Sequence, residues 1–156
     1  MTDELNELYQ QVILDHSRKP RNFGKCPGHN HTAQGTNPLC GDNYAVYLKL
    51  EGDIIKDVSF EGSGCAISKA SGSMMTDFLK GKTVAEAQKY FGLFQQMVTT
   101  GQADEEQVGK LYAFAGVHNF PMRVKCAVLP WHALVAGLKA GENKVVSTEE
   151  PKTPGF

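Results

Sequence analysis

The segment that decides the fold is Glu61-Gly62-Ser63-Gly64-Cys65-Ala66-Ile67-Ser68-Lys69-Ala70-Ser71-Gly72-Ser73-Met74-Met75. Before it, residues 54–60 alternate apolar and polar side chains, as a half-buried strand does. After it, apolar residues recur at helical spacing over residues 67–79. The two glycines before the cysteine mark the change, because glycine tolerates backbone angles that other residues avoid. The sequence therefore places Cys65 where a strand ends and a helix begins.

A cysteine at the start of a helix has a chemical consequence. Unpaired N–H groups in the first helical turn favour negative charge, so the Cys65 thiol tends to ionise there. A thiolate is both a metal ligand and a nucleophile. Two other segments carry cysteines that could join it: Asn37-Pro38-Leu39-Cys40-Gly41-Asp42 upstream and Arg123-Val124-Lys125-Cys126 downstream.

Length and composition indicate one globular domain. The chain has 156 residues, of which 41% are hydrophobic and 21% charged, which is ordinary for a domain with a real core. A net charge of −1 predicts no nucleic-acid partner, and no apolar run approaches the roughly 20 residues that span a membrane. Residues 1–7 are acidic and polar, unlike a signal peptide, so we expect a cytoplasmic protein without disulfides. Its four cysteines are then thiols, metal ligands or redox groups.

Periodicity and turn signals predict the order of the elements. Helices are expected at residues 3–16, at 67–79, from Thr83 through Tyr90, after Asp104, and from about residues 122–125 to 138. Strands at 44–50 and 54–60 form an antiparallel hairpin, and a short third strand is expected around residues 62–65. Residues 24–43 are rich in glycine and proline and are predicted to be a long loop. Residues 141–156 are polar and are predicted to be a flexible C-terminal tail.

The three cysteine segments together contain a possible set of metal ligands. Cys40 and Asp42 lie two residues apart, and on an extended turn they point the same way. Cys65 follows across the hairpin, which returns the chain beside its start, and Cys126 lies at the start of the last helix. Three thiolates and one carboxylate suit tetrahedral zinc. The spacing is also compatible with three unrelated buried cysteines, because no tight C-x-x-C pair is present.

Five other polar residues have open roles at this point. Cys26, His29 and His31 either form a second metal cluster or decorate an exposed loop. Arg123 and Lys125 are either simply solvated or stabilise a thiolate or a bound carboxylate.

At these residues the chain resembles the IscU/SufU/NifU N-terminal type of iron–sulfur assembly protein. The matching segments are Leu14-Asp15-His16 with Pro20-Arg21-Asn22, Cys40-Gly41-Asp42, Gly64-Cys65-Ala66-Ile67-Ser68, and Arg123-Val124-Lys125-Cys126. The resemblance runs from about Leu5 to Ala140. It implies an α+β fold, in which a small three-stranded antiparallel sheet is packed by about five helices in a single domain, residues 1–140. It also implies a metal site formed by four residues: Cys40, Asp42, Cys65 and Cys126.

Two features resemble the SufU-like branch of this family. Residues 95–116 look like the extra segment of that branch, and Lys125 stands where IscU-like scaffolds have histidine. SufU-like proteins bind zinc and accept sulfur from a pyridoxal-phosphate-dependent cysteine desulfurase, and Cys40 matches the acceptor position. The resemblance therefore implies a zinc-dependent, sulfurtransferase-like acceptor that passes persulfide sulfur to downstream iron–sulfur assembly proteins.

Two rival functions remain open from the sequence. One is a scaffold on which the same four residues assemble a transient [2Fe–2S] cluster. The other is a binding module with a purely structural zinc ion. A purified scaffold should be able to turn brown, whereas a zinc acceptor stays colourless and accelerates a desulfurase. The sequence does not identify the final sulfur acceptor or the oligomeric state.

Overall fold

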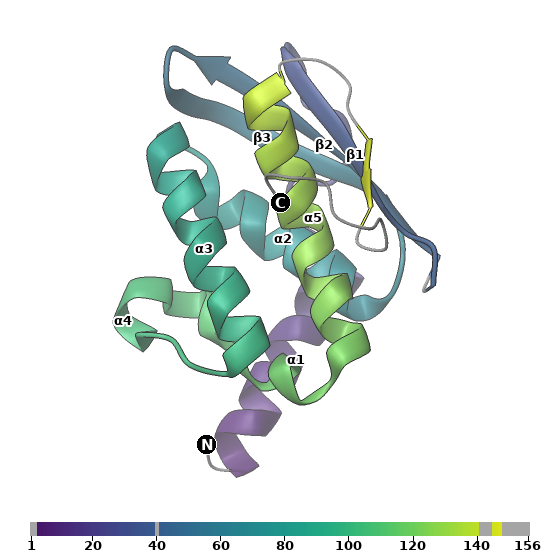
Figure 1. Ribbon diagram of the computed structural model, residues 1–156, viewed down its shortest axis with the longest axis vertical. Coiled ribbons are helices and arrows are strands. Elements are labelled where there is room, and N and C mark those ends of the chain that lie inside the picture. Colours follow the sequence, from purple (N-terminus) through teal and green to yellow (C-terminus); the bar gives the residue numbers. More distant parts are fainter. Residues whose placement is uncertain (1–2, 40, 141–144, 148–156) are drawn as a thin grey trace.

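The sheet is an antiparallel meander with helices packed against it (Figure 1). This computed structural model describes residues 3–39, 41–140 and 145–147. The strands are β1 (His31–Asn37), β2 (Asp42–Glu51), β3 (Ile54–Ser63) and β4 (Val145–Ser147). The helices are α1 (Asp3–Arg18), α2 (Ala66–Leu79), α3 (Val84–Thr100), α4 (Glu105–Val108) and α5 (Pro121–Ala140), with a 3-10 helix η1 (Gly109–Asn119) before α5. The predicted α+β fold with a three-stranded antiparallel sheet is confirmed.

The central hairpin confirms one prediction and the third strand corrects another. β2 pairs with β3 from Asn43 opposite Ser63 to Glu51 opposite Ile54, as the turn at residues 51–53 predicted. The third strand is β1, however, and it lies inside the segment predicted to be loop, while residues 62 and 63 simply end β3. β1 alternates buried and half-buried positions, but its inward residues are small or polar and give no apolar period-2 signal.

Small residues on β1 let helix α5 pack closely over the sheet. A Cβ added at Gly35 would lie 3.0 Å from Leu129 Cδ1 and 3.3 Å from Ala133 Cβ. At the other end of the same contact, a Cβ at Gly137 would lie 3.6 Å from Ala33 Cβ. Strand and helix therefore run side by side with their spacing set by glycine and alanine. Further along, this packing brings the end of β1 to the start of α5.

The helix boundaries show where local signals succeed and fail. Thr83 and Glu86 form a capping box at the start of α3, where the sequence predicts that a helix begins. The helix then continues to Thr100, well past the predicted extent through Tyr90, because Met97 and Val98 face inward and are fully buried. α5 begins at Pro121 and includes Pro130. No helix in the described part of the chain is long and apolar enough to cross a membrane.

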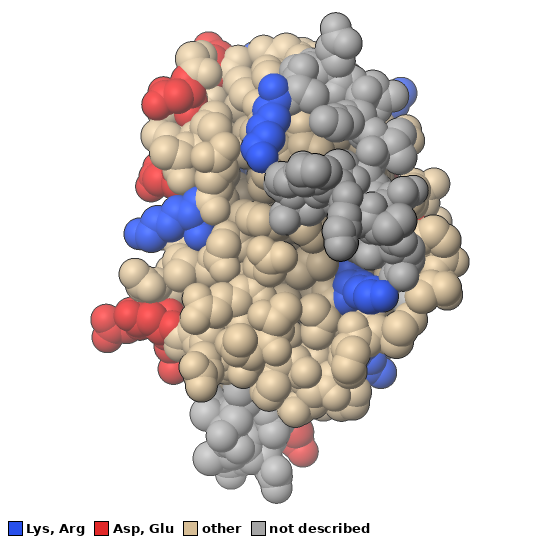
Figure 2. Space-filling view, viewed as in Figure 1, with Lys and Arg blue, Asp and Glu red and all other residues tan. Residues whose placement is uncertain are grey.

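The C-terminal segment contributes one short strand. Within the predicted tail, Val145–Ser147 form β4, which pairs parallel to β1 at the edge of the sheet. The rest of that segment lies outside the described residues, so the division of the chain at residue 140 stays a prediction. Figure 2 shows lysine and arginine side chains scattered on the face viewed, with no single basic patch.

Candidate metal centre

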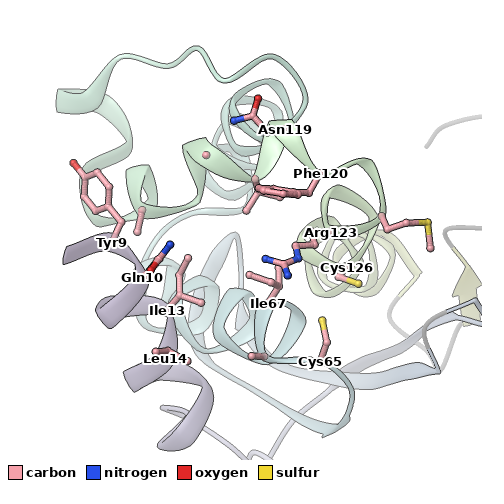
Figure 3. Close-up of a pocket in the computed structure, with 15 residues that line it drawn as sticks. Tyr9, Gln10, Ile13, Leu14, Cys65, Ile67, Asn119, Phe120, Arg123 and Cys126 are labelled. Carbon is pink, nitrogen blue, oxygen red and sulfur yellow. The ribbon is translucent and has the colours of Figure 1, made fainter. Parts of the chain in front are cut away.

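Three chain segments meet at one end of the sheet. Asp42 is the first residue of β2, Cys65 precedes α2, and Cys126 lies in the second turn of α5. One donor atom from each of the three residues lies within 4.8 Å of the other two. Figure 3 shows the sulfur atoms of Cys65 and Cys126 directed toward each other. The hairpin thus returns the chain beside its start, as its sequence predicted.

A hydrogen bond and a glycine together place the Asp42 carboxylate. Asp42 is buried, and its Oδ1 accepts a hydrogen bond of 2.9 Å from the backbone N–H of Cys65. Its Oδ2 lies 4.0 Å from Cys65 Sγ. A Cβ at Gly64 would stand 2.4 Å from Asp42 Oδ1, so only glycine at this position leaves room for the carboxylate.

The sulfur of Cys65 caps helix α2. The backbone N–H of Ser68 donates to Cys65 Sγ at 3.5 Å, which confirms that this cysteine stands between strand and helix. Ser68 Oγ donates to the carbonyl of Cys65 at 3.0 Å and lies 2.9 Å from the Tyr44 hydroxyl. Because Tyr44 belongs to β2, this chain of contacts ties the cap to the sheet.

The two thiols affect each other's ionisation. The pKa of Cys65 is lowered to about 6, first because its sulfur accepts a hydrogen bond from Cys126 and then because it accepts bonds from Ser68. The pKa of Cys126 is raised by that same bond to Cys65, by burial and by Asp42. The pair therefore gives up one proton easily and retains the other. Arrival of a cation would release the second proton, because metal binding competes with protons for thiolates.

The donor set fits a zinc ion. Around a tetrahedral zinc with ligand distances of about 2.0–2.3 Å, neighbouring donor atoms lie roughly 3.3–3.8 Å apart. Donor atoms within 4.8 Å of one another need only small side-chain adjustments to reach that spacing. A buried carboxylate beside two thiols also concentrates negative charge that an ion would neutralise.

Cys40, the predicted fourth ligand and sulfur acceptor, lies outside the described residues. Its assignment therefore stays a prediction, although it is two residues from Asp42 in the sequence.

The possible second cluster of Cys26, His29 and His31 is not formed, and the alternative that these residues decorate an exposed loop is wrong for Cys26. Cys26 is buried, and its pKa is raised to about 11, chiefly by burial and then by a hydrogen bond with Asp57. The His29 ring packs on Tyr47 with 4.9 Å between ring centres, and His31 Nδ1 lies 2.8 Å from the carbonyl of Gly137. Each residue thus has its own packing contact. Among the described residues, the only group of potential metal ligands is the one around Cys65.

A groove of about 750 Å³ opens beside the two thiols (Figure 3). Its walls come from α1, the start of α2, the end of η1 and the start of α5, and both Cys65 and Cys126 line it. Phe120 and Met122 on its border are 51% and 46% exposed, and the Arg123 guanidinium lies 5.0 Å from the centre of the Phe120 ring. Sequence patterns did not predict this groove, because its walls come from four separate elements.

Asn37 is a further residue to which sequence patterns gave no role. It is fully buried at the end of β1, and its side-chain amide nitrogen lies 3.9 Å from Cys126 Sγ. Its side-chain oxygen has no hydrogen-bond partner among the described residues. The only sequence signal for it is its place at the start of the Cys40–Asp42 segment.

Comparison with known proteins places these features in context. A family model described as NifU-like N terminal domain matches residues 8–127. A zinc-dependent sulfurtransferase SufU from Bacillus subtilis is 42% identical over 139 residues, covering 88% of this chain and 94% of that protein. An iron–sulfur cluster assembly scaffold protein IscU from Streptococcus pyogenes is 40% identical over 149 residues, covering 94% of this chain and 92% of that protein.

Solved structures share the fold at similar identity. A crystal structure of a candidate iron–sulfur cluster assembly scaffold protein for the SUF system, from Fervidobacterium islandicum, superposes with a TM-score of 0.79. The two sequences are 39% identical, and the match covers 86% of this chain and 98% of that one.

Proposed function

The chain belongs to the NifU-like N-terminal domain family, and from this premise we propose that it serves iron–sulfur cluster assembly as a zinc-dependent sulfur acceptor. The observation that carries the proposal is the meeting of Asp42, Cys65 and Cys126 at one end of the sheet. The names of the relatives support a role in cluster assembly or sulfur transfer, but they divide between the two at nearly equal identity, 42% and 40%. The choice between them rests on this chain's own residues.

In this proposal, four side chains hold the zinc ion: Cys40, Asp42, Cys65 and Cys126. When bound, zinc would neutralise the charge of the buried carboxylate and keep the thiols deprotonated at neutral pH. Cys65 and Asp42 are already held by backbone hydrogen bonds, so little rearrangement is needed.

Cys40 is the proposed sulfur acceptor. Its thiolate attacks the terminal sulfur of a persulfide on the cysteine of a pyridoxal-phosphate-dependent cysteine desulfurase. A new S–S bond forms to Cys40, the S–S bond of the donor breaks, and the donor cysteine leaves as a thiolate with the electron pair. No external oxidant or reductant is needed, and downstream assembly proteins take the sulfur from Cys40.

The groove provides an approach for the desulfurase. It leads to Cys65 and Cys126, and its border carries the exposed apolar side chains of Phe120 and Met122. Exposed apolar surface beside a reactive centre is typical of a site that a partner covers. We expect the desulfurase to bury this border when it delivers sulfur.

The scaffold function is the alternative, supported by the relative named IscU. The same four residues would then bind a transient [2Fe–2S] cluster. Lys125 argues against it, because an ammonium group repels metal ions whereas imidazole binds iron well. If Lys125 separates the two functions, Lys125→His should retain more iron and sulfide than wild type after anaerobic reconstitution. Equal retention of iron and sulfide in the variant and wild type would remove the argument that Lys125 disfavours the scaffold function.

The direct test compares two single variants. Cys40→Ala should lose sulfur acceptance while keeping part of its zinc, since Asp42, Cys65 and Cys126 remain. Cys65→Ala should lose zinc and activity together. Zinc content, persulfide mapping by mass spectrometry and desulfurase turnover measure the two roles separately. If Cys40→Ala accelerates desulfurase turnover as fully as wild type does, Cys40 is not the sulfur acceptor.

A further inference from the structure

We infer that Asn37 is a positioning residue of the metal centre, whose side-chain amide donates a hydrogen bond to Cys126 Sγ and thereby strengthens metal binding. The inference rests on the proposed zinc site but concerns a residue outside the ligand set. Asn37 and Cys126 are 89 residues apart in the sequence, and their side chains meet at 3.9 Å in a buried position.

The side chain of Asn37 does not make the hydrogen bond that an asparagine at a turn usually makes. Such a side chain commonly accepts a hydrogen bond from the backbone N–H two residues on. Here the backbone carbonyl of Asn37 accepts the N–H of Gly41 at 2.9 Å. The side-chain oxygen has no partner among the described residues, so the turn does not account for the amide.

Burying the side-chain amide of Asn37 is unfavourable unless a specific interaction offsets its loss of contact with water. A buried polar group without its hydrogen bonds destabilises the folded protein, and Asn37 has a relative exposure of 0%. The other inward positions of β1, Ala33 and Gly35, carry no polar side chain. An asparagine at the third inward position therefore needs a reason, and the contact with Cys126 provides one.

The chemistry of the contact suits a metal-bound thiolate. Such a sulfur has no proton and can only accept hydrogen bonds, so the amide presents its N–H to Cys126. The other ligand sulfur has a comparable donor, because the backbone N–H of Ser68 lies 3.5 Å from Cys65 Sγ. Each of these sulfurs thus has one N–H donor, which holds it in place and reduces its negative charge. Partners of this kind outside the ligand set tune metal affinity.

The packing of β1 under α5 makes the contact rigid. Gly35 lies so close to Leu129 and Ala133 that an added Cβ would be 3.0–3.3 Å from them, tighter than ordinary van der Waals contact. Because the strand and the helix are held at this spacing, Asn37 cannot move far from the second turn of α5. The position of Cys126 is therefore supported from the sheet as well as from its own helix.

The test uses Asn37→Leu, which keeps the side-chain size but removes the N–H donor and the unpaired oxygen. This substitution removes the unpaired side-chain oxygen and leaves only a cysteine sulfur, a weak acceptor in the metal-free protein, without its donor. We therefore expect the metal-free variant to be about as stable as wild type, while its zinc dissociation constant rises roughly 10- to 100-fold, as for other outer partners of metal ligands. Asn37→Ala provides a second variant with the same loss of the donor.

A spectroscopic signature separates positioning from general destabilisation. In the cobalt-substituted protein, removal of the N–H bond raises the electron density on sulfur, so the sulfur-to-cobalt charge-transfer band should shift to lower energy. Ser71→Ala is the matched control, because Ser71 Oγ donates to the carbonyl of Ala127, next to Cys126, at 2.6 Å. It should lower stability and leave the band in place.

The outcomes are distinct. Folded Asn37→Leu or Asn37→Ala with wild-type zinc affinity and an unshifted band would overturn the inference and leave the zinc site intact. If wild type takes up neither zinc nor cobalt, the proposed metal centre falls as well. Weaker zinc binding with a shifted band in the Asn37 variants, and an unshifted band in Ser71→Ala, would establish the positioning role.

Discussion

Two buried cysteines in this molecule illustrate the difference between a core thiol and a site. Cys26 and Cys126 are 2% and 3% exposed, and the pKa of each is raised. For Cys26 the main cause is burial, whereas for Cys126 it is the hydrogen bond with Cys65. Burial alone therefore does not identify a metal ligand. The convergence of further donors, here Asp42 and Cys65, distinguishes the candidate site.

The strongest test of this contrast removes the converging donors. The double variant Cys65→Ala/Cys126→Ala should lose its zinc and unfold at a markedly lower temperature, because structural zinc can contribute on the order of 10 kcal/mol of apparent binding energy. Metal analysis of the protein as isolated and thermal unfolding with and without chelator provide the measurement. Full zinc occupancy in this variant would refute the site.

A smaller loss of zinc binding is expected when the Asp42 carboxylate is crowded by an added side-chain atom. Gly64→Ala places a Cβ 2.4 Å from Asp42 Oδ1 and should break its bond to the Cys65 N–H. Loss of a hydrogen bond to a charged group is worth about 1.5–3 kcal/mol, so zinc affinity should fall by at least tenfold in a chelator competition.

Gly92→Ala is the matched control for that experiment. Gly92 lies within α3 and has no atom within 4 Å of an added Cβ. Alanine is favoured over glycine inside a helix by roughly 0.5–1 kcal/mol, so this variant should be slightly more stable and bind zinc as wild type does. A Gly64→Ala variant that binds zinc equally well would show that Asp42 is not held as described.

Cys26→Ser should affect stability without affecting zinc. It exchanges a buried thiol for a more polar hydroxyl near Asp57, and such a change costs on the order of 1 kcal/mol. Zinc content and desulfurase stimulation should stay at wild-type levels, as expected for a residue outside the ligand set. A large loss of either would bring Cys26 into the mechanism and erase the contrast with Cys126.

The same residue also predicts a pH dependence of stability. The pKa of Cys26 is raised in the folded protein from 9.0 to about 11, so folding favours its protonated thiol. That contribution is fully present below the unfolded pKa near 9 and is lost as pH rises through about 11. The difference in unfolding free energy between wild type and Cys26→Ser should therefore shrink between pH 9 and 11, as chemical denaturation at each pH would show. A difference that stays constant across this range would contradict the assigned environment.

Local signals were sufficient for several parts of the fold. The β2–β3 hairpin, the change from strand to helix at Cys65 and the capping box at Thr83 all follow from residues within a few positions of one another. The sequence did not reveal β1, because its inward residues Ala33, Gly35 and Asn37 are not an apolar stripe. The choice of small or polar residues at these alternate positions is explained only by helix α5, which packs on them.

The sequence by itself determined the chemical character of the site: thiols and a carboxylate at turns and helix starts, with two glycines before Cys65 where the strand changes to a helix. Those features are local, so residue type and spacing encode them. Only the tertiary structure decided that Gly64 leaves room for Asp42, that Asn37 meets Cys126, that Cys26 is isolated from the ligands, and that a groove opens beside the thiols. Each of these depends on close packing between segments far apart in the chain, such as β1 under α5, and no local periodicity records which distant residues will touch.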